Sequence, residues 1–168
     1  MASEDRVHER HKQPTPLIQA RELVIVAPPL RSNVNLSRIV RAASCCGLTR
    51  LIACGNPRLD PKIARDGVDQ VKLEIRRTLP PVINSLRSTG HRLVGLEQTN
   101  DSVSLHEYAF HRRTALVIGH ERHGIEEDVL KLLDEVVEIP VYGLPFSYNV
   151  ATAAAMALYE YCRQYPSG

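Results

Sequence analysis

Short, continuous runs of apolar residues, separated by segments with helical periodicity, are the feature of this sequence that most restricts its fold. The runs lie within residues 22–27, 50–54, 91–97, 114–119 and 135–140, and the last of these segments also contains two glutamates. Each is too short for a buried helix and lacks the alternation of a half-exposed strand, so each is predicted to be a buried strand. Because strands of this kind alternate with helical segments, the sequence predicts an α/β fold with a mostly parallel sheet flanked by helices.

The helical segments are expected at about residues 32–47, 61–67, 78–88, 126–133 and 147–164. In the first, apolar side chains recur at the spacing of one buried helix face, at Leu36, Ile39, Val40 and Ala43. Asn33 or Asn35 is expected to cap the start of this helix, and Gly47 to end it.

The first twenty residues are polar and contain two prolines, whereas the rest of the 168-residue chain has the pattern of one globular unit. We therefore expect a polar tail at residues 1–20 and a single domain at residues 21–168. The N-terminus lacks the apolar segment of a secretory signal, and no apolar run approaches the ~20 residues that span a bilayer. These features predict a cytoplasmic protein without a membrane segment.

The cysteines and the net charge give weaker indications. Cys45, Cys46, Cys54 and Cys162 include no CxxC pair, so we expect buried free thiols and no bound metal. The net charge is +2, and several arginines are concentrated in the N-terminal half. This charge permits a polyanionic partner without establishing one.

Three polar loops follow predicted strands: "GLEQT", "GHERHGI" and "IPVYGLPFSYN". Ligands of open parallel sheets bind at the carboxyl ends of the strands, so these loops are candidates for a binding site. The sequence contains neither GxGxxG after its first strand nor GxxxxGK[ST], which argues against a Rossmann dinucleotide site and a P-loop.

Three segments together resemble the motifs of one family. "NLSRIVRAASCCG" has an asparagine, an arginine six residues later and then a glycine. "VIGHERHGI" has a glycine and a glutamate before a G-I helix start, and "EIPVYGLPFSYNVATAAAMALYEY" leads from I-P through S-x-N-V into an alanine-rich helix. In this order they resemble the SpoU (TrmH-like) RNA 2′-O-ribose methyltransferases of the SPOUT superfamily, over about residues 22–164.

The resemblance implies a deep trefoil knot in the C-terminal part of the sheet, S-adenosylmethionine (SAM) bound by the knot loops, and a homodimer. It implies methyl transfer to a ribose 2′-hydroxyl in RNA, with a guanosine of the tRNA D-loop as the first substrate to test and ribosomal RNA as the alternative. The additional N-terminal RNA-binding domain of some members is expected to be missing. The chain departs from the family at His120, Tyr148 and Ala151, where asparagine, leucine and serine are common.

The motifs assign roles to particular residues. The catalytic residues implied by the resemblance are Asn35, Arg41, Glu121, Ser147 and Asn149. The cofactor-binding residues implied by it are Glu97, Thr99, Gly119, Glu121, Ile139, Leu144, Ser147 and Asn149. We expect Arg41 to orient the ribose and hold the adjacent phosphate, since a guanidinium does not readily lose its proton.

Each motif also has a plainer structural interpretation. Arg41 fits a solvated helix surface, Asn35 a helix cap, Gly119 a tight turn, and the alanines after Asn149 an ordinary packed core. Two other functions are consistent with this pattern of strands and helices: a non-catalytic RNA-binding protein with the same fold, and a small Rossmann-like nucleotide enzyme. The missing glycine fingerprint argues against the latter.

Overall fold

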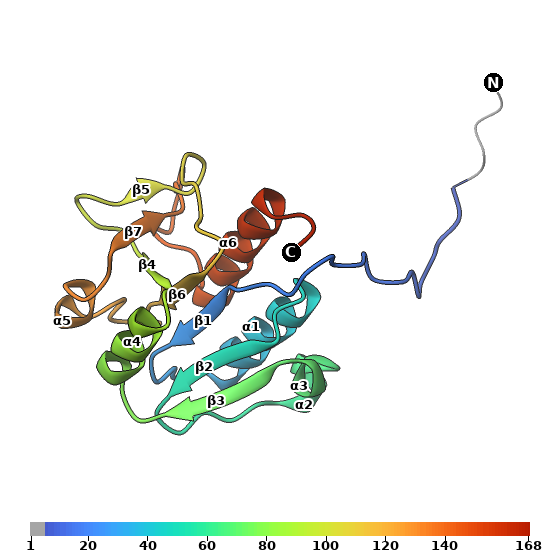
Figure 1. Ribbon diagram of the computed structural model, residues 1–168, viewed down its shortest axis with the longest axis horizontal. Helices are drawn as coiled ribbons and strands as arrows, with labels where there is room; N and C mark the ends of the chain where they lie inside the picture. Colours follow the sequence, from blue (N-terminus) through green and yellow to red (C-terminus); the bar gives the residue numbers. More distant parts are fainter. Residues whose placement is uncertain (1–5) are drawn as a thin grey trace.

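The computed structural model describes residues 6–168, and within them seven strands form one sheet (Figure 1). The strands are β1 (Val24–Ala27), β2 (Arg50–Cys54), β3 (Lys72–Arg76), β4 (Arg92–Leu96), β5 (Val103–Ser104), β6 (Thr114–Ile118) and β7 (Glu135–Glu138). Their order across the sheet is β3-β2-β1-β6-β4-β7-β5, and every pairing is parallel. The predicted parallel α/β sheet is confirmed.

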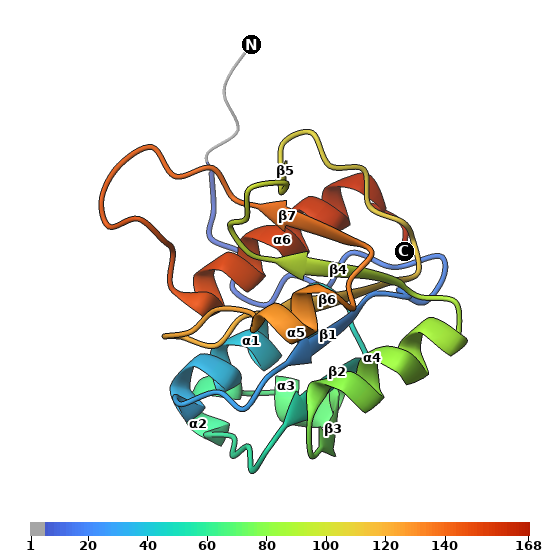
Figure 2. The same cartoon turned by 90° about the vertical axis from the view of Figure 1, so that its left-hand side faces the viewer.

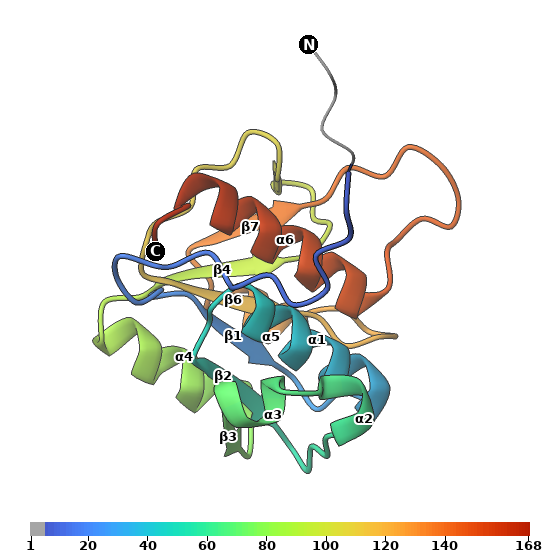
Figure 3. The ribbon, with the colours of Figure 1, turned by 90° about the vertical axis from the view of Figure 1, so that its right-hand side faces the viewer.

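The helices lie on both faces of the sheet (Figure 3). They are α1 (Asn33–Cys45), α2 (Pro61–Ala64), α3 (Gly67–Gln70), α4 (Leu79–Ser88), α5 (Glu127–Leu130) and α6 (Val150–Gln164). Alternate side chains of β1 divide between the two cores: Ile25 packs on the side of α1 and α6, and Val26 on the side of α4 and α5. Because both faces are covered, the central strands consist almost entirely of apolar residues.

Two strands and several helix ends differ from the prediction. β3 was missed because charged residues alternate with apolar ones at this sheet edge, and β5 because it has only 2 residues. The segment predicted as one helix at residues 61–67 contains α2 and only the first residue of α3, because Arg65 adopts φ 54° between the two helices. Of the helix predicted at residues 126–133, only Glu127–Leu130 is helical, as α5. The last helix begins at Val150, not at Ser147.

Helix α1 begins differently from the prediction. Ser32 is its N-cap, and its side chain accepts a hydrogen bond from the backbone N–H of Asn35, so neither Asn33 nor Asn35 has that role. Gly47 follows the C-cap with φ 74°, as expected for a residue that ends a helix. The four cysteines are free, but the expected burial is wrong for three of them, because only Cys54 is buried.

The residues before β1 form no helix or strand within residues 6–23. Arg21 attaches the end of this segment to the domain by donating hydrogen bonds of 2.6 Å to the carbonyl oxygens of Cys46 and Tyr165. Residues 1–5 of the predicted tail lie outside the described part, and the division at residue 20 stays a prediction. No helix in residues 6–168 is long and apolar enough to cross a membrane. The knot also stays a prediction.

The segment between β7 and α6 projects from the body of the domain as a long loop (Figure 2). Tyr142, Leu144 and Phe146 lie on it with most of their surface exposed. The loop returns to the sheet at Ser147 and Tyr148, immediately before the cap of α6. It therefore combines an apolar outer part with an inner end beside the carboxyl edge of the sheet.

Candidate functional site

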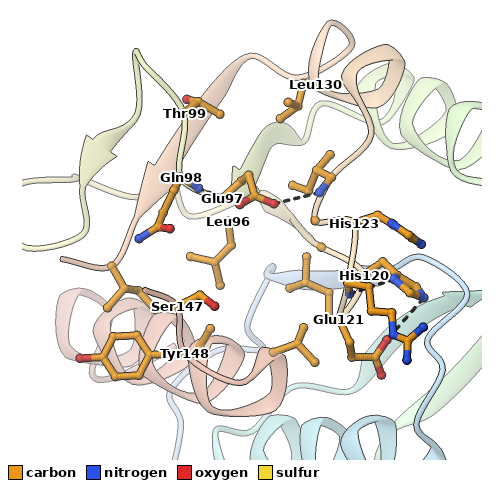
Figure 4. A pocket seen from close by; sticks show the side chains of 18 of the residues that line it. Leu96, Glu97, Gln98, Thr99, His120, Glu121, His123, Leu130, Ser147 and Tyr148 are labelled. Atoms are coloured by element: carbon orange, nitrogen blue, oxygen red, sulfur yellow. Dashed lines mark hydrogen bonds and ion pairs between the residues drawn. The ribbon is translucent and has the colours of Figure 1, made fainter. Parts of the chain in front are cut away.

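A cavity of about 470 Å³ lies at the carboxyl edge of the sheet, between the loops that follow β4, β6 and β7 (Figure 4). These are the three loops that the sequence analysis proposed as a binding site. Apolar residues form part of its wall, including Leu96, Ile118, Ile139 and Val150. Polar groups come from Thr99, from the turn His120–Gly124 and from Ser147. A cavity of this size and mixed lining is typical of sites for small organic ligands and cofactors.

The carboxylate of Glu97 connects the loops after β4 and β6. One oxygen accepts a hydrogen bond of 2.9 Å from the backbone N–H of Gln98, and the other accepts one of 2.9 Å from that of Ile125. Glu97 therefore shapes the cavity, and both of its oxygens are engaged by the backbone.

Two glycines make this close packing of the loops possible. A Cβ atom on Gly124, which has φ 64°, would lie 2.2 Å from a carboxylate oxygen of Glu97. A Cβ on Gly119 would lie 2.9 Å from the backbone of Gly124. The glycines of "GHERHG" are thus required by a tight turn whose ends, His120 and Gly124, pair through backbone hydrogen bonds of 2.9 and 3.0 Å.

Glu121 joins the same turn to the start of α1. Its carboxylate accepts hydrogen bonds from the backbone N–H groups of Arg31 at 3.0 Å and Ser32 at 2.9 Å, and from the side-chain amide of Asn35 at 3.2 Å. Burial acts to raise the pKa of Glu121, but these hydrogen bonds outweigh it, so the pKa lies below its ordinary value. An ionised carboxylate also suits the N-terminal end of a helix.

Asn35 and Asn149 continue this polar chain to α6. The Asn149 side chain caps α6 by accepting hydrogen bonds from Ala151 and Thr152, at 2.9 and 3.4 Å. Its amide nitrogen donates a hydrogen bond of 3.2 Å to the side-chain oxygen of Asn35. Since Asn35 is 7% exposed, its side chain is held from both sides. Hydrogen bonds therefore run from Asn149 through Asn35 to Glu121 and link all three motifs.

The structure places most of the predicted site residues together. Those that line the cavity are Glu97, Thr99, Gly119, Glu121, Ile139 and Ser147. Asn35 is bonded to Glu121 at the cavity wall, and Asn149 is bonded to Asn35. The hypothesis that Asn35 caps its own helix is wrong, because Ser32 has that role. Leu144 is 78% exposed on the projecting loop and lies outside the lining.

Arg41 also lies outside the cavity. It is exposed on α1, six residues beyond Asn35, which corresponds to roughly 9 Å of helix rise. Among the side chains that the structure describes, it has no hydrogen-bond or ion-pair partner. Its guanidinium therefore points into solvent, where a bound macromolecule can reach it.

His120 and His123 were not predicted as site residues, although both line the cavity. Their rings stack with centroids 4.9 Å apart and planes 14° apart. Their spacing of three residues within "GHERHG" is the only sequence signal, and it acquires meaning only when the turn brings the rings together.

The sequence model of the SpoU rRNA Methylase family matches residues 22–159, which include every residue of the polar chain and of the cavity wall. The chain belongs to the SpoU rRNA methylase family. This agrees with the resemblance carried by the three motifs, whose residues Asn35, Glu121 and Asn149 are joined by hydrogen bonds beside the cavity.

Two curated relatives and one solved structure are similar to this SpoU family chain. It is 30% identical over 148 residues to mouse tRNA (guanosine(18)-2′-O)-methyltransferase TARBP1, covering 84% of this chain and 9% of that protein. It is 27% identical over 146 residues to Escherichia coli tRNA (guanosine(18)-2′-O)-methyltransferase, covering 85% of this chain and 64% of that enzyme. The chain therefore spans less than two thirds of either relative.

The crystal structure of the SpoU methyltransferase AviRb from Streptomyces viridochromogenes has the same fold as this SpoU family chain. That structure is a complex with the cofactor AdoMet, which is another abbreviation of S-adenosylmethionine. The two align with a TM-score of 0.75 and 26% sequence identity, over 90% of this chain and 64% of AviRb. The likeness extends over nearly the whole described domain.

Proposed function

We propose that this chain transfers a methyl group from SAM to a ribose 2′-hydroxyl in RNA. The observation that carries the proposal is the hydrogen-bonded chain Asn149–Asn35–Glu121, which unites the three motifs of the SpoU family beside a cavity of about 470 Å³. The names of the mouse and E. coli relatives and the AdoMet complex of AviRb support the same activity.

The cavity fits SAM in size and in chemistry. Leu96, Ile118 and Ile139 offer an apolar surface for the adenine, and backbone groups of the loop 139–141 are free of helix or strand pairing at its edge. Thr99 and Ser147 can hydrogen-bond the polar parts of the cofactor. When bound, SAM supplies a methyl group on a positively charged sulfur, already activated for transfer.

The protein must then position the ribose hydroxyl and help it lose its proton. Glu121 holds the start of α1 and the amide of Asn35 in place, so Asn35 is a positioning residue with a fixed orientation. Arg41 projects from the same helix and is available to bind a ribose oxygen and the neighbouring phosphate through its planar guanidinium. The phosphate so held is a suitable acceptor for the proton.

A guanosine of the tRNA D-loop is the first substrate we propose, because two relatives carry tRNA guanosine(18) in their names. Ribosomal RNA is the second candidate, favoured by the description of the family itself. A non-catalytic RNA-binding role is the alternative to an enzyme. Glu121, Asn35 and Asn149 argue against it, since their side chains are tightly arranged beside the cavity.

We further propose a homodimer that works in the cytoplasm. Tyr142, Leu144 and Phe146 on the projecting loop and Tyr159 on α6 are large apolar side chains, each more than 70% exposed. Exposed apolar groups of this kind mark interaction surfaces, and a surface that binds its own copy usually forms a two-fold dimer. The cytoplasmic location follows from the proposed tRNA substrate, which the name of the E. coli relative supports.

Mass-spectrometric mapping of ribose methylation in cellular RNA tests the proposal. RNA from cells lacking the gene is expected to lose one 2′-O-methyl nucleoside, which returns when the wild-type gene is restored but not when an Arg41→Ala gene is. An unchanged methylation map of both tRNA and rRNA would contradict the assignment.

A further inference from the structure

A row of exposed arginines follows the strands at the carboxyl edge of the sheet. Arg77 follows β3, Arg58 lies in the loop after β2, Arg31 follows β1, and Arg122 lies in the turn after β6. Because the sheet order is β3-β2-β1-β6, the four residues succeed one another across the sheet in the direction of the cofactor cavity. Within residues 6–168, none of these four side chains makes a hydrogen bond or an ion pair.

The opposite edge of the sheet has arginines of a different kind. Near the amino ends of the strands, five arginines are bound to a carboxylate: Arg50 to Glu74, Arg87 to Asp134, Arg92 to Glu135, and Arg112 and Arg113 to Glu22. Arg21, before β1, is bound to two backbone carbonyl oxygens. Arginines paired in this way have little capacity left for an external anion. Among the arginines next to strand ends, those without a carboxylate or carbonyl partner therefore lie at the edge that carries the proposed active site.

The carboxylates at the carboxyl edge do not neutralise the row. Asp60 accepts a hydrogen bond from the backbone N–H of Lys62 and caps α2. Glu97 and Glu121 accept theirs from the backbone around the cavity. The exposed residues Glu126, Glu127 and Asp128, at the start of α5, differ from this pattern, and Glu126 also lines a cavity near Arg77. Arg76, next to Arg77 in the chain, pairs with Glu74. Asp60, Glu97 and Glu121 thus hold loops, and none of the acidic groups of this edge forms an ion pair with the four arginines of the row in residues 6–168.

A second cavity, of about 420 Å³, lies between Arg77 and the turn His120–Gly124. Its walls combine the pyrrolidine rings of Pro28, Pro29 and Pro80 with the stacked rings of His120 and His123. Flat apolar and aromatic walls beside a cationic side chain are the usual surroundings of an unstacked nucleobase.

We propose that the arginine row binds the phosphates of an RNA strand that crosses the carboxyl edge from β3 toward β6, and that the second cavity holds one unstacked base of that strand. The inference rests on the proposed function, because it assumes that the macromolecule at this edge is RNA. It adds the path of the strand and the residues that bind it on the side of β2 and β3, far from the cofactor cavity. Four successive guanidinium groups suit a chain of phosphates, whose charge dominates RNA affinity.

Binding of an unmodified tRNA transcript at several salt concentrations tests the row. The double variant Arg58→Gln/Arg77→Gln removes two members that touch neither the cofactor cavity nor the polar chain. The control Arg87→Gln/Arg113→Gln removes the same charge from the opposite edge. The first variant is expected to bind on the order of tenfold more weakly, with the slope of log affinity against log salt reduced by about 0.7–0.9 for each lost phosphate contact. The control is expected to bind like the wild type.

Three further measurements keep the proposal separate from the methyltransferase assignment. Thermal melting checks that both double variants are folded, and calorimetry with S-adenosylhomocysteine is expected to give equal affinity in all of them. Methyl transfer by Arg58→Gln/Arg77→Gln should show a raised KM for RNA with kcat nearly unchanged. Equal RNA affinity and equal salt slopes in the two double variants would refute RNA binding by the arginine row, even if the wild type methylates RNA. If salt-dependent RNA binding is lost only in Arg58→Gln/Arg77→Gln and the wild type methylates no RNA, RNA binding by the row is supported and the proposed function is refuted.

Discussion

Asn35 donates a hydrogen bond of 3.2 Å to the carboxylate of Glu121, although 86 residues separate the two in the chain. The same side chain accepts a hydrogen bond from Asn149, so Asn35 is held between the turn after β6 and the cap of α6. The side chains of Asn35, Glu121 and Asn149 therefore position one another, because a substitution of one removes a hydrogen-bond partner of its neighbour.

Asn149 combines two roles that substitutions can separate. Asn149→Ala removes both the cap of α6 and the donor to Asn35, and is expected to cost about 1 kcal/mol of stability for the cap. Asn149→Asp keeps a capping oxygen but has no amide donor, so it should retain nearly wild-type stability while activity falls. Chemical denaturation and methylation rates measure the two quantities. Wild-type activity in Asn149→Asp would show that the bond to Asn35 is unimportant.

Glu121 should make stability depend on pH below its ordinary pKa of 4.5, because its pKa is lowered in the folded protein. Its contribution is fully present above pH 4.5 and is lost as the pH falls through the lower folded-state value. Glu121→Gln is therefore expected to be destabilised by about 1–3 kcal/mol at neutral pH, through an unpaired backbone N–H. The difference from the wild type should shrink in acid. A difference that stays constant from pH 7 to pH 3 would exclude this origin.

Gly124→Ala tests the close packing of the cavity loops. Its new Cβ would lie 2.2 Å from a Glu97 oxygen that is held by the backbone of Ile125, at a position with φ 64°. We expect a loss of roughly 1–3 kcal/mol in stability and weaker SAM binding. The matched control is Gly143→Ala, because no atom lies within 4 Å of the Cβ that it adds. Thermal melting and calorimetry that fail to distinguish the two variants would refute this role of Gly124.

The proposed homodimer depends on the apolar surface of the projecting loop and α6. Phe146→Asp combined with Tyr159→Asp places charges on two side chains that are 79% and 71% exposed, and is expected to give a monomer. Val7→Asp, at a residue 86% exposed in the N-terminal segment, is the control and should leave association unchanged. Light scattering at micromolar concentration measures the oligomeric state of the wild type, the double variant and the control. A wild-type monomer, or a double variant that remains dimeric, would contradict the proposed interface.

The sequence predicted the main strands because buried parallel strands are continuous apolar runs, which β1, β2, β4 and β6 illustrate well. It missed β3, whose charged residues at the sheet edge conceal the strand pattern. The sequence did not predict the order of the strands either, because the position of β6 between β1 and β4 depends on long-range packing.

The candidate site was predicted more completely than the contacts within it. The motifs indicated Asn35, Glu121 and Asn149, yet Asn35 was expected to cap its own helix. A local capping bond is the simplest use of an asparagine near a helix start, and Ser32 takes that role instead. The bonds of Asn35 depend on residues 86 and 114 positions away, which no local pattern encodes.

Single-turnover transfer of a labelled methyl group from SAM to unmodified tRNA and rRNA tests the central claim most directly, with SAM affinity measured in parallel. The wild type is expected to place the label on a ribose 2′-oxygen, identified after digestion to nucleosides. Arg41→Ala should transfer about 100-fold or more slowly with unchanged SAM affinity, and Arg41→Lys should recover little, because an ammonium lacks the planar fork. Label on a base, no transfer to either RNA by folded wild-type protein, or full activity in Arg41→Ala would contradict the account.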